Sequence, residues 1–254
     1  MTPSFFPQIE RGDPTRFAAL MAAPPAARTD LATLYAFNLE IARAPWVTKE
    51  PMIAEMRLQW WRDSLQDAEN GTIRAHEVMQ PLATLMTQQS LPLDALDRMV
   101  EARRWDIYSD PFTDQTALDD YLMDTAGGLM WLSGKALGAG AASEPALRAF
   151  GWATGLAAYL QAVPDLVERG RIPLLDGRDE AIATLARRGL AQLAKARKSH
   201  IDPAARPALL AGWQTQSLLT MAARTPARVG DGQLQLSEFT RRGRLLWQAF
   251  TDRF

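Results

Sequence analysis

The sequence predicts an all-α protein. Apolar residues recur every three or four positions between prolines and glycines, which is the spacing of one face of an α-helix. No stretch alternates apolar and polar residues between Asn-Gly or Asp-Gly turns, as a β-hairpin would. Hydrophobic residues make up 47% and charged residues 22% of the 254 residues, a composition typical of a globular chain with a large core. We therefore expect one helical domain covering residues 1–254.

Prolines delimit the first two long helices. Thr29, a residue type that caps helix N-termini, precedes a stretch that Pro45 ends. Pro51 suits the first position of a second helix, which Asn70-Gly71 closes. The first helix presents a series of side chains at helical steps: Leu31, Leu34, Tyr35, Asn38 and Ile41. The second is apolar on so many sides that we expect it to be buried between others.

Proline, glycine and capping residues predict the remaining helices. These are expected near residues 74–89, 93–107, 178–199, 203–224 and 234–252. Thr116 and Asp119 suggest a capping box at one helix start, and Ser143 begins another helix, which Pro164 is expected to interrupt. The small residues between positions 151 and 158 leave a bare face that can admit a neighbouring helix or a ligand.

Charge and composition exclude several classes of function. The formal net charge is −1, so the chain has no general attraction to nucleic acid. It has no cysteine, which excludes disulfides and thiolate zinc sites and fits a reducing cytoplasm. The N-terminus lacks a secretory-signal pattern, and the apolar tract at 126–142 contains glycines and Lys135, unlike a membrane span. We expect a cytoplasmic protein with at most peripheral membrane contact.

The C-terminal run from Arg241 to Phe254 combines arginines with Leu, Trp and Phe at helical steps. Such a helix can settle on an anionic membrane surface, or it can dock on the rest of the bundle as an ordinary amphipathic helix. The sequence leaves both interpretations open.

Four short motifs lie in the first two thirds of the chain. They are Tyr35-Ala36-Phe37, Arg57-Leu58-Gln59-Trp60-Trp61-Arg62-Asp63, Tyr121 followed by Ala126-Gly127, and Arg169-Gly170-Arg171-Ile172-Pro173. In order and spacing they resemble the squalene/phytoene synthase family. The resemblance implies an isoprenoid-synthase-like bundle of helices around a central cavity, in which two allylic diphosphates are joined head to head.

The resemblance also implies pairs of aspartates, four residues apart, on two facing helices. Residues i and i+4 share a helix face, so such pairs converge on magnesium, which prefers oxygen ligands and neutralises the leaving diphosphate. Counted from the neighbouring motifs, the first aspartates fall on Ala42, Arg43 and Trp46, and the second pair falls on Ala162 and Leu166. None of these side chains binds magnesium. Without magnesium, the leaving diphosphate loses several charge interactions of about 4 kcal/mol each. A loss of about 8 kcal/mol of transition-state stabilisation slows a reaction about a millionfold, so efficient catalysis of the family type is not expected.

A narrower resemblance concerns the segment around the first missing aspartates. Asn38, Glu40 and Ala42 stand where the synthases carry a Cys-Arg-x-x-Asp-Asp pattern. This arrangement is similar to that of a branch of the family that includes the mitochondrial assembly factor of respiratory complex I. The resemblance implies an assembly or chaperone-like role rather than catalysis.

Two hypotheses follow for the function. The first is a squalene/phytoene-synthase-like protein without prenyltransferase activity and without a cofactor, which binds an isoprenoid, another lipid or a protein partner during respiratory complex I assembly. The alternative is an active head-to-head prenyl-diphosphate transferase with an altered magnesium site, built from Asp124, Asp165 and Glu168.

Eight residues are predicted to line the ligand cavity: Asn38, Glu40, Arg57, Trp61, Asp124, Gln161, Asp165 and Arg171. Arg57 and Arg171 carry guanidinium groups that match phosphate oxygens, although each can pair with a carboxylate instead. Trp61 suits the core and can also face a ligand. Asp120 and Asp124 are four residues apart, but Asp120 lies near a helix start, where acidic residues interact favourably with the helix dipole. We predict no catalytic residue and no metal ligand.

Overall fold

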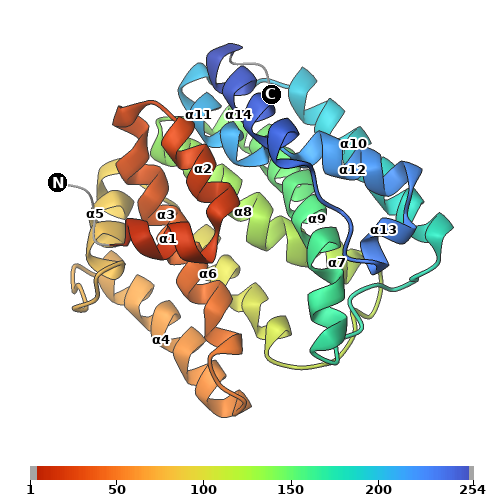
Figure 1. Cartoon of the computed structure of the whole chain (residues 1–254). Coiled ribbons are helices and arrows are strands. Elements are labelled where there is room, and N and C mark those ends of the chain that lie inside the picture. Colours follow the sequence, from red (N-terminus) through yellow and green to blue (C-terminus); the bar gives the residue numbers. More distant parts are fainter. Residues whose placement is uncertain (1–4, 252–254) are drawn as a thin grey trace.

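The computed structural model describes residues 5–251. These residues form helices joined by short loops and include no strand, which confirms the predicted all-α class (Figure 1). The α-helices are α1 Phe6–Gly12, α2 Pro14–Ala22, α3 Pro25–Arg43, α4 Pro51–Glu69, α5 Met79–Gln89, α6 Leu93–Ala102, α7 Gln115–Leu122, α8 Gly128–Ala136, α9 Glu144–Glu168, α10 Asp179–Lys198, α11 Arg206–Leu209, α12 Thr215–Arg224, α13 Ala227–Gly230 and α14 Glu238–Thr251. Shorter turns are η1 Ala44–Trp46, η2 Arg103–Asp106, η3 Met123–Gly127, η4 Ala141–Ser143, η5 Pro203–Ala205 and η6 Leu210–Gly212.

Several predicted helix boundaries are confirmed by the structure. α4 starts at Pro51, α9 follows Ser143 directly, and α10 covers nearly all of the expected span 178–199. These boundaries have local causes, because a proline or an acidic residue suits the first turn of a helix wherever the rest of the chain lies.

Other predicted boundaries are wrong. Thr29 does not cap α3, which begins one turn earlier at Pro25, and the carbonyl of Thr29 accepts a hydrogen bond from the hydroxyl of Thr33 (2.9 Å). Thr116 does not cap α7. The cap is Asp114, whose carboxylate accepts a hydrogen bond from the backbone N–H of Ala117 (2.9 Å). In both places a second good start residue lies a few positions upstream, and tertiary packing selects it.

Packing also overrides the predicted breaks. Pro164 does not interrupt α9, which continues to Glu168 because buried side chains on both sides of the proline hold the helix in place. The helix expected at 203–224 is divided into α11, η6 and α12 instead. There Gly212 lies against the ring of Phe150, so closely that an added Cβ would approach a ring carbon to 2.4 Å. The two N-terminal helices α1 and α2 were not predicted.

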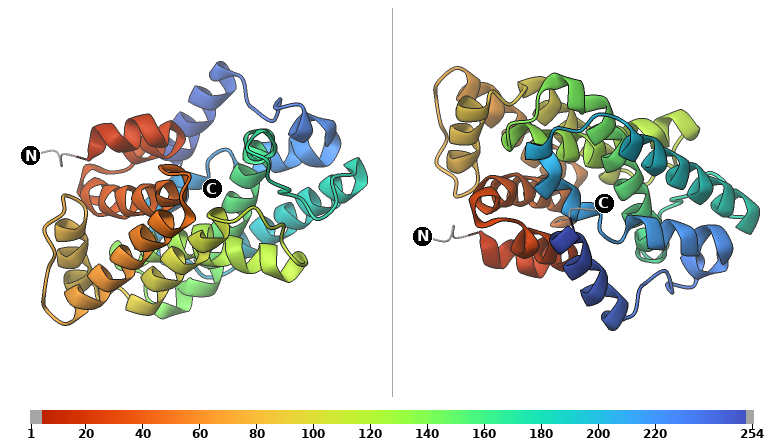
Figure 2. Two further views of the ribbon diagram at one scale, coloured as in Figure 1. Left: turned by 90° about the horizontal axis from the view of Figure 1, so that it is seen from below. Right: turned by 90° about the horizontal axis from the view of Figure 1, so that it is seen from above.

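The long helix α9 lies at the centre of the bundle. It packs against α8, α10, α12 and the turn η3, and α3 packs against the opposite side of α8 (Figure 1). At the other end of the chain, α14 packs against α2, so helices from the two ends of the sequence lie side by side at the edge of the molecule (Figure 2). The C-terminal run is therefore docked on the bundle as far as residue 251, and residues 252–254 lie outside the described range.

Within residues 5–251, no helix combines the length and apolar composition needed to cross a bilayer.

Glycines allow α9 to approach the neighbouring helix closely. The segment Met123–Gly127 is a turn of π-helix between α7 and α8. A Cβ added to Gly151 would lie 2.5 Å from the carbonyl oxygen of Ala126, and one added to Gly155 would lie 2.5 Å from the Cβ of Ala126. Of the small residues predicted to admit a helix or a ligand, Gly151 and Gly155 allow the close helix contact, and Thr154, Gly155 and Ala158 line a cavity.

Candidate functional site

A central cavity of about 290 Å³ lies between α3, η1, η2, η3 and α9. Its apolar lining comprises Ala42, Trp46, Leu122, Ala126, Leu129, Gly155, Ala158, Ala162 and Leu166. Its polar lining comprises Arg16, Asn38, Arg103, Asp106, Tyr121, Thr125, Thr154 and Tyr159. The lining is therefore mixed, and four of its polar residues, Asn38, Arg103, Asp106 and Tyr121, form a connected group that we call the polar wall.

Two pairs of apolar residues occupy opposite walls of this cavity. Ala42 and Trp46 come from the end of α3 and from η1, and Ala162 and Leu166 come from α9. Within each pair the residues are four positions apart, so the spacing that would bring two carboxylates together is retained. None of the four side chains offers an oxygen ligand, and these residues therefore do not fit a magnesium ion. Among the described residues, no group of three or more Asp, Glu, His or Cys side chains is placed to hold a metal.

The polar wall is a network centred on Arg103. Its guanidinium donates to the hydroxyl of Tyr121 (2.8 Å), lies 3.3 Å from the carboxylate of Asp106 and donates to the amide oxygen of Asn38 (3.4 Å). The hydroxyl of Tyr121 in turn donates to Asp106 (3.0 Å). The Nε of Arg103 is buried and makes no hydrogen bond within the described part of the chain. Four side chains from three elements, α3, η2 and α7, are thus joined by hydrogen bonds.

Burial changes the acid–base properties of this network. Loss of solvent raises the pKa of Asp106, although the positive charge of Arg103 and the hydrogen bond from Tyr121 oppose this effect. Burial also raises the pKa of Tyr121. For Arg103 burial acts to lower the pKa, but the attraction of Tyr121 and Asp106 outweighs it, and the pKa is raised. Arg103 therefore stays positively charged, held inside the fold by its own partners.

Arg171 fixes the turn that carries Asp106. Its guanidinium donates to the backbone carbonyls of Trp105 (3.2 Å) and Asp106. It also lies over the rings of Trp46 and Trp105, 5.3 Å from each centroid, and only 6% of the residue is exposed. Because its donors already meet carbonyls and its faces meet aromatic rings, Arg171 supports the cavity wall.

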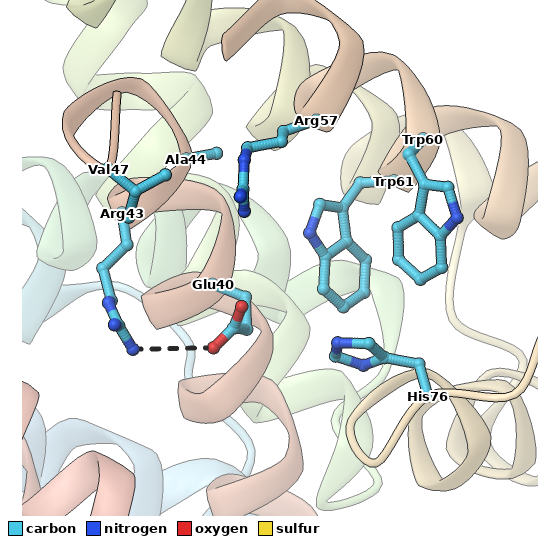
Figure 3. A pocket seen from close by; sticks show the side chains of 8 residues that line it. All are labelled: Glu40, Arg43, Ala44, Val47, Arg57, Trp60, Trp61 and His76. Carbon is cyan, nitrogen blue, oxygen red and sulfur yellow. Dashed lines mark ion pairs between the residues drawn. The ribbon is translucent and has the colours of Figure 1, made fainter. Parts of the chain in front are cut away.

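A second pocket, the outer groove, lies on the other side of α3. It has a volume of about 360 Å³ and is lined by Glu40, Arg43, Ala44, Val47, Arg57, Trp60, Trp61 and His76 (Figure 3). Glu40 pairs with Arg43 at 3.8 Å, and the ring of Trp61 packs edge-on against Phe37, with centroids 5.4 Å apart. Figure 3 shows Arg57 extending from α4 into the space above Glu40.

The structure does not bring the eight predicted residues together. Asn38 lines the central cavity, whereas Glu40, Arg57 and Trp61 line the outer groove. Asn38 and Glu40 are two positions apart on α3, which places them on nearly opposite faces of the helix.

The remaining four candidates lie elsewhere. Gln161 lines a smaller pocket of about 160 Å³ and donates to the carbonyl of Leu234 (2.8 Å). Asp124 lies in η3, 3.7 Å from Arg98. Asp165 is exposed on α9, and Arg171 is buried behind the wall of the central cavity.

Sequence reasoning missed Arg103 and Asp106, which form the polar wall. The only signal was their opposite charge at a three-residue spacing, which is common on helix surfaces. Nothing in that spacing shows that both side chains point inward.

The sequence model of a family described as squalene/phytoene synthase matches residues 9–174. This range covers α2 to α9 and all the elements that line the central cavity. The chain belongs to the squalene/phytoene synthase family. The predicted family resemblance and the predicted isoprenoid-synthase-like fold are both confirmed.

Two solved structures share this fold over most of the length of both chains. The chain is similar to a dehydrosqualene synthase crystallised with a ligand, with a TM-score of 0.79, 16% identity, and coverage of 97% of this chain and 94% of that one. It is also similar to the squalene synthase HpnC from Alicyclobacillus acidocaldarius, with a TM-score of 0.74, 18% identity, and coverage of 87% and 93%. At these identities the likeness establishes the fold.

Two curated relatives carry the name of a complex I assembly factor. The complex I assembly factor 6 homolog of Dictyostelium discoideum is 25% identical over 47% of this chain and 34% of its own length. Assembly factor 6 of Mus musculus is 23% identical over 61% of this chain and 47% of its own length. The matched regions thus span about a third of one relative and about half of the other.

Proposed function

We propose that this protein is a non-catalytic member of the squalene/phytoene synthase family. In this proposal the central cavity binds the apolar part of a lipid, such as an isoprenoid, and the protein acts in the assembly of respiratory complex I. The observation that carries the proposal is the pair of facing cavity walls, where Ala42 and Trp46 oppose Ala162 and Leu166. A metal-dependent prenyltransferase needs carboxylates at such a place to hold the cations that neutralise diphosphate.

The lining of the cavity favours an apolar ligand with one polar end. Apolar residues make up about half of the lining, and the Arg103 network gathers several of the polar groups at one place. At about 290 Å³ the cavity lies near the lower end of the range for small-molecule sites, roughly 300–1,000 Å³. This volume suits one lipid tail better than the two diphosphate substrates of a head-to-head condensation.

The assembly role is supported by the relatives. Both curated relatives are named for complex I assembly. The alternative of an altered magnesium site has less support, because Asp165 and Glu168 are exposed on α9 and Asp124 pairs with Arg98 in η3.

The first experiment separates the two hypotheses. Purified protein is incubated with farnesyl or geranylgeranyl diphosphate and magnesium, and release of diphosphate is measured. We expect no release above a protein-free control. Turnover that disappears in the Asp165→Asn variant would establish the enzyme and overturn the proposal.

The second experiment tests the cavity. Organic extraction of the purified protein followed by mass spectrometry should recover a lipid from the wild type. The Ala162→Phe variant, which fills the cavity, should lose this lipid. The Ala194→Phe variant, with the same change at an exposed position of α10, should retain it. Equal recovery from both variants would show that the lipid is bound elsewhere.

The third experiment tests the assembly role. Cells lacking this protein should contain less fully assembled complex I on native gels, with NADH dehydrogenase activity reduced in the same bands. Wild-type protein should restore both, and Ala162→Phe should restore less than Ala194→Phe. Normal complex I in the deletion strain would contradict the proposed role.

A further inference from the structure

A groove rich in arginine lies in the last third of the chain, where residues of α12, α13 and α14 line it. We call it the C-terminal groove. Its volume is about 500 Å³, and its basic lining residues are Arg224, Arg228 and Arg244. Hydroxyl groups of Ser217 and Thr220 also line it, and no Asp or Glu belongs to the lining that the structure describes.

Within the described residues, no arginine of this groove has an acidic partner. Arg244 donates to the hydroxyl of Ser217, and Arg228 donates to the sulfur of Met221 (3.3 Å), which is a weak acceptor. Arg224 makes no hydrogen bond or ion pair within residues 5–251.

Many arginines elsewhere in the protein are paired with acids. Arg62, for example, lies 2.6 Å from Asp97 and 2.5 Å from Glu101. The C-terminal groove therefore differs from the rest of the surface in concentrating guanidinium groups without carboxylates.

A fourth arginine adds to the positive charge. Arg197 on α10 donates to Gln216 at the edge of the groove (2.7 Å). Burial, and then the positive charge of Arg244, lower the pKa of Arg197, as expected for a guanidinium placed near another positive charge. A bound anion would relieve the repulsion between these charges.

We propose that the C-terminal groove binds the phosphate or diphosphate group of a ligand. Guanidinium forks match phosphate oxygens in two-point contacts, and the hydroxyl of Ser217, which accepts from Arg244, can donate a further hydrogen bond. The groove lies outside the family match at residues 9–174, and none of its lining residues belongs to the central cavity. This proposal therefore does not depend on the one for the central cavity.

The phosphate group can belong to a soluble diphosphate or to a phospholipid at a membrane surface. The helix that supplies Arg244 also carries four exposed apolar side chains, Phe239 (90% exposed), Leu246 (70%), Trp247 (53%) and Phe250 (94%). A bilayer would accept these side chains, whereas a soluble ligand would not involve them. The two sources can therefore be distinguished by experiment.

The first measurement uses inorganic pyrophosphate as the probe. Isothermal titration of the wild type at constant ionic strength should show saturable binding. The double variant Arg224→Gln with Arg228→Gln should bind at least about tenfold more weakly, because each charged hydrogen bond to phosphate is worth that much or more. The matched control, Arg11→Gln with Arg187→Gln, makes the same charge change at exposed positions outside the groove and should bind as the wild type does.

A conservative variant distinguishes the shape of the guanidinium group from its positive charge. Arg244→Lys keeps the positive charge but loses the guanidinium fork, and should bind pyrophosphate more weakly than the wild type. Equal weakening in the groove variant and the control, or binding of polyglutamate as tightly as pyrophosphate, would overturn the proposal by showing general charge attraction.

The second measurement identifies the source of the phosphate. Vesicles of phosphatidylcholine with and without phosphatidic acid are sedimented with the protein. If the ligand is a lipid headgroup, wild type should sediment only with phosphatidic acid, and Phe239→Ser with Phe250→Ser should lose vesicle binding while keeping pyrophosphate binding. If the ligand is soluble, pyrophosphate should bind and the vesicles should not. Failure of both probes would refute the site.

Discussion

The central cavity and the C-terminal groove both contain arginines, but in opposite electrostatic settings. In the cavity, Arg103 meets Asp106 and Tyr121 of the same chain, with Tyr121 at 2.8 Å. In the groove, Arg224 and Arg228 have no carboxylate partner within the described residues. The comparison shows that an arginine paired inside the protein mainly supports the fold, whereas unpaired arginines lining a groove remain available to an anion.

The largest effect on stability is expected when Arg103, the paired arginine of the central cavity, is replaced. Replacing it by Met leaves Asp106 buried without its cation, and we expect a loss of about 3–5 kcal/mol in the free energy of unfolding. Urea unfolding followed by circular dichroism measures this loss. Adding Asp106→Asn to Arg103→Met should cost less than the sum of the two single changes, because the residues act as a pair. A loss below about 1 kcal/mol would mean that the network contributes little.

The close contact between α9 and η3, two elements that line the cavity, provides the next test. Gly151→Ala places a methyl group 2.5 Å from the carbonyl oxygen of Ala126, and overpacking of this kind costs about 1–3 kcal/mol. Gly177→Ala is the matched control, because a Cβ there would meet nothing within 4 Å. Equal stability of the two variants in urea would show that α9 can move away from η3 without cost.

The pH dependence of the free energy of unfolding tests whether the pKa of Asp106 is raised in the paired network. Burial raises the pKa of Asp106 above its ordinary value of 3.8, so the folded protein holds that proton more tightly than the unfolded chain does. This tighter binding of the proton adds to the free energy of unfolding. Its contribution is complete at pH values below 3.8 and is lost as the pH rises through the pKa of Asp106 in the folded protein. Relative to Asp106→Asn, the wild type should therefore lose stability as the pH rises from about 4, as measured by urea unfolding at several pH values. A difference that stays constant with pH would contradict the raised pKa.

The smallest effect is expected in the C-terminal groove. Arg224→Met removes an exposed charge without an acidic partner, and the free energy of unfolding should change by no more than about 0.5 kcal/mol. The same urea experiment as for Arg103→Met measures it, so the two substitutions form a matched pair. A loss as large as that at Arg103 would show that Arg224 supports the fold and would remove the contrast between the two sites.

The sequence predicted the fold well because its signals are local. Proline at position 51 and the residues around Ser143 start helices correctly, since a favourable first turn requires only neighbouring residues. Thr29, Thr116 and Pro164 misled the prediction because packing against distant helices selected other boundaries.

The candidate site was predicted only in part. The positions of the missing aspartates were assigned from the motifs, and Ala42 and Ala162 line the same cavity. The polar wall could not be predicted, because Arg103 and Asn38 are 65 residues apart and meet only when α3 packs beside η2.

The sequence by itself determined the helical class, the family, and the loss of oxygen ligands from the two positions four residues apart on each wall. These properties depend on residue type and on spacing within one helix. Only the tertiary structure decided which polar groups meet, because hydrogen bonds such as that between Arg103 and Tyr121 join separate elements. It also decided that Arg224, Arg228 and Arg244 share one groove without a carboxylate, since this arrangement depends on how α12, α13 and α14 pack together.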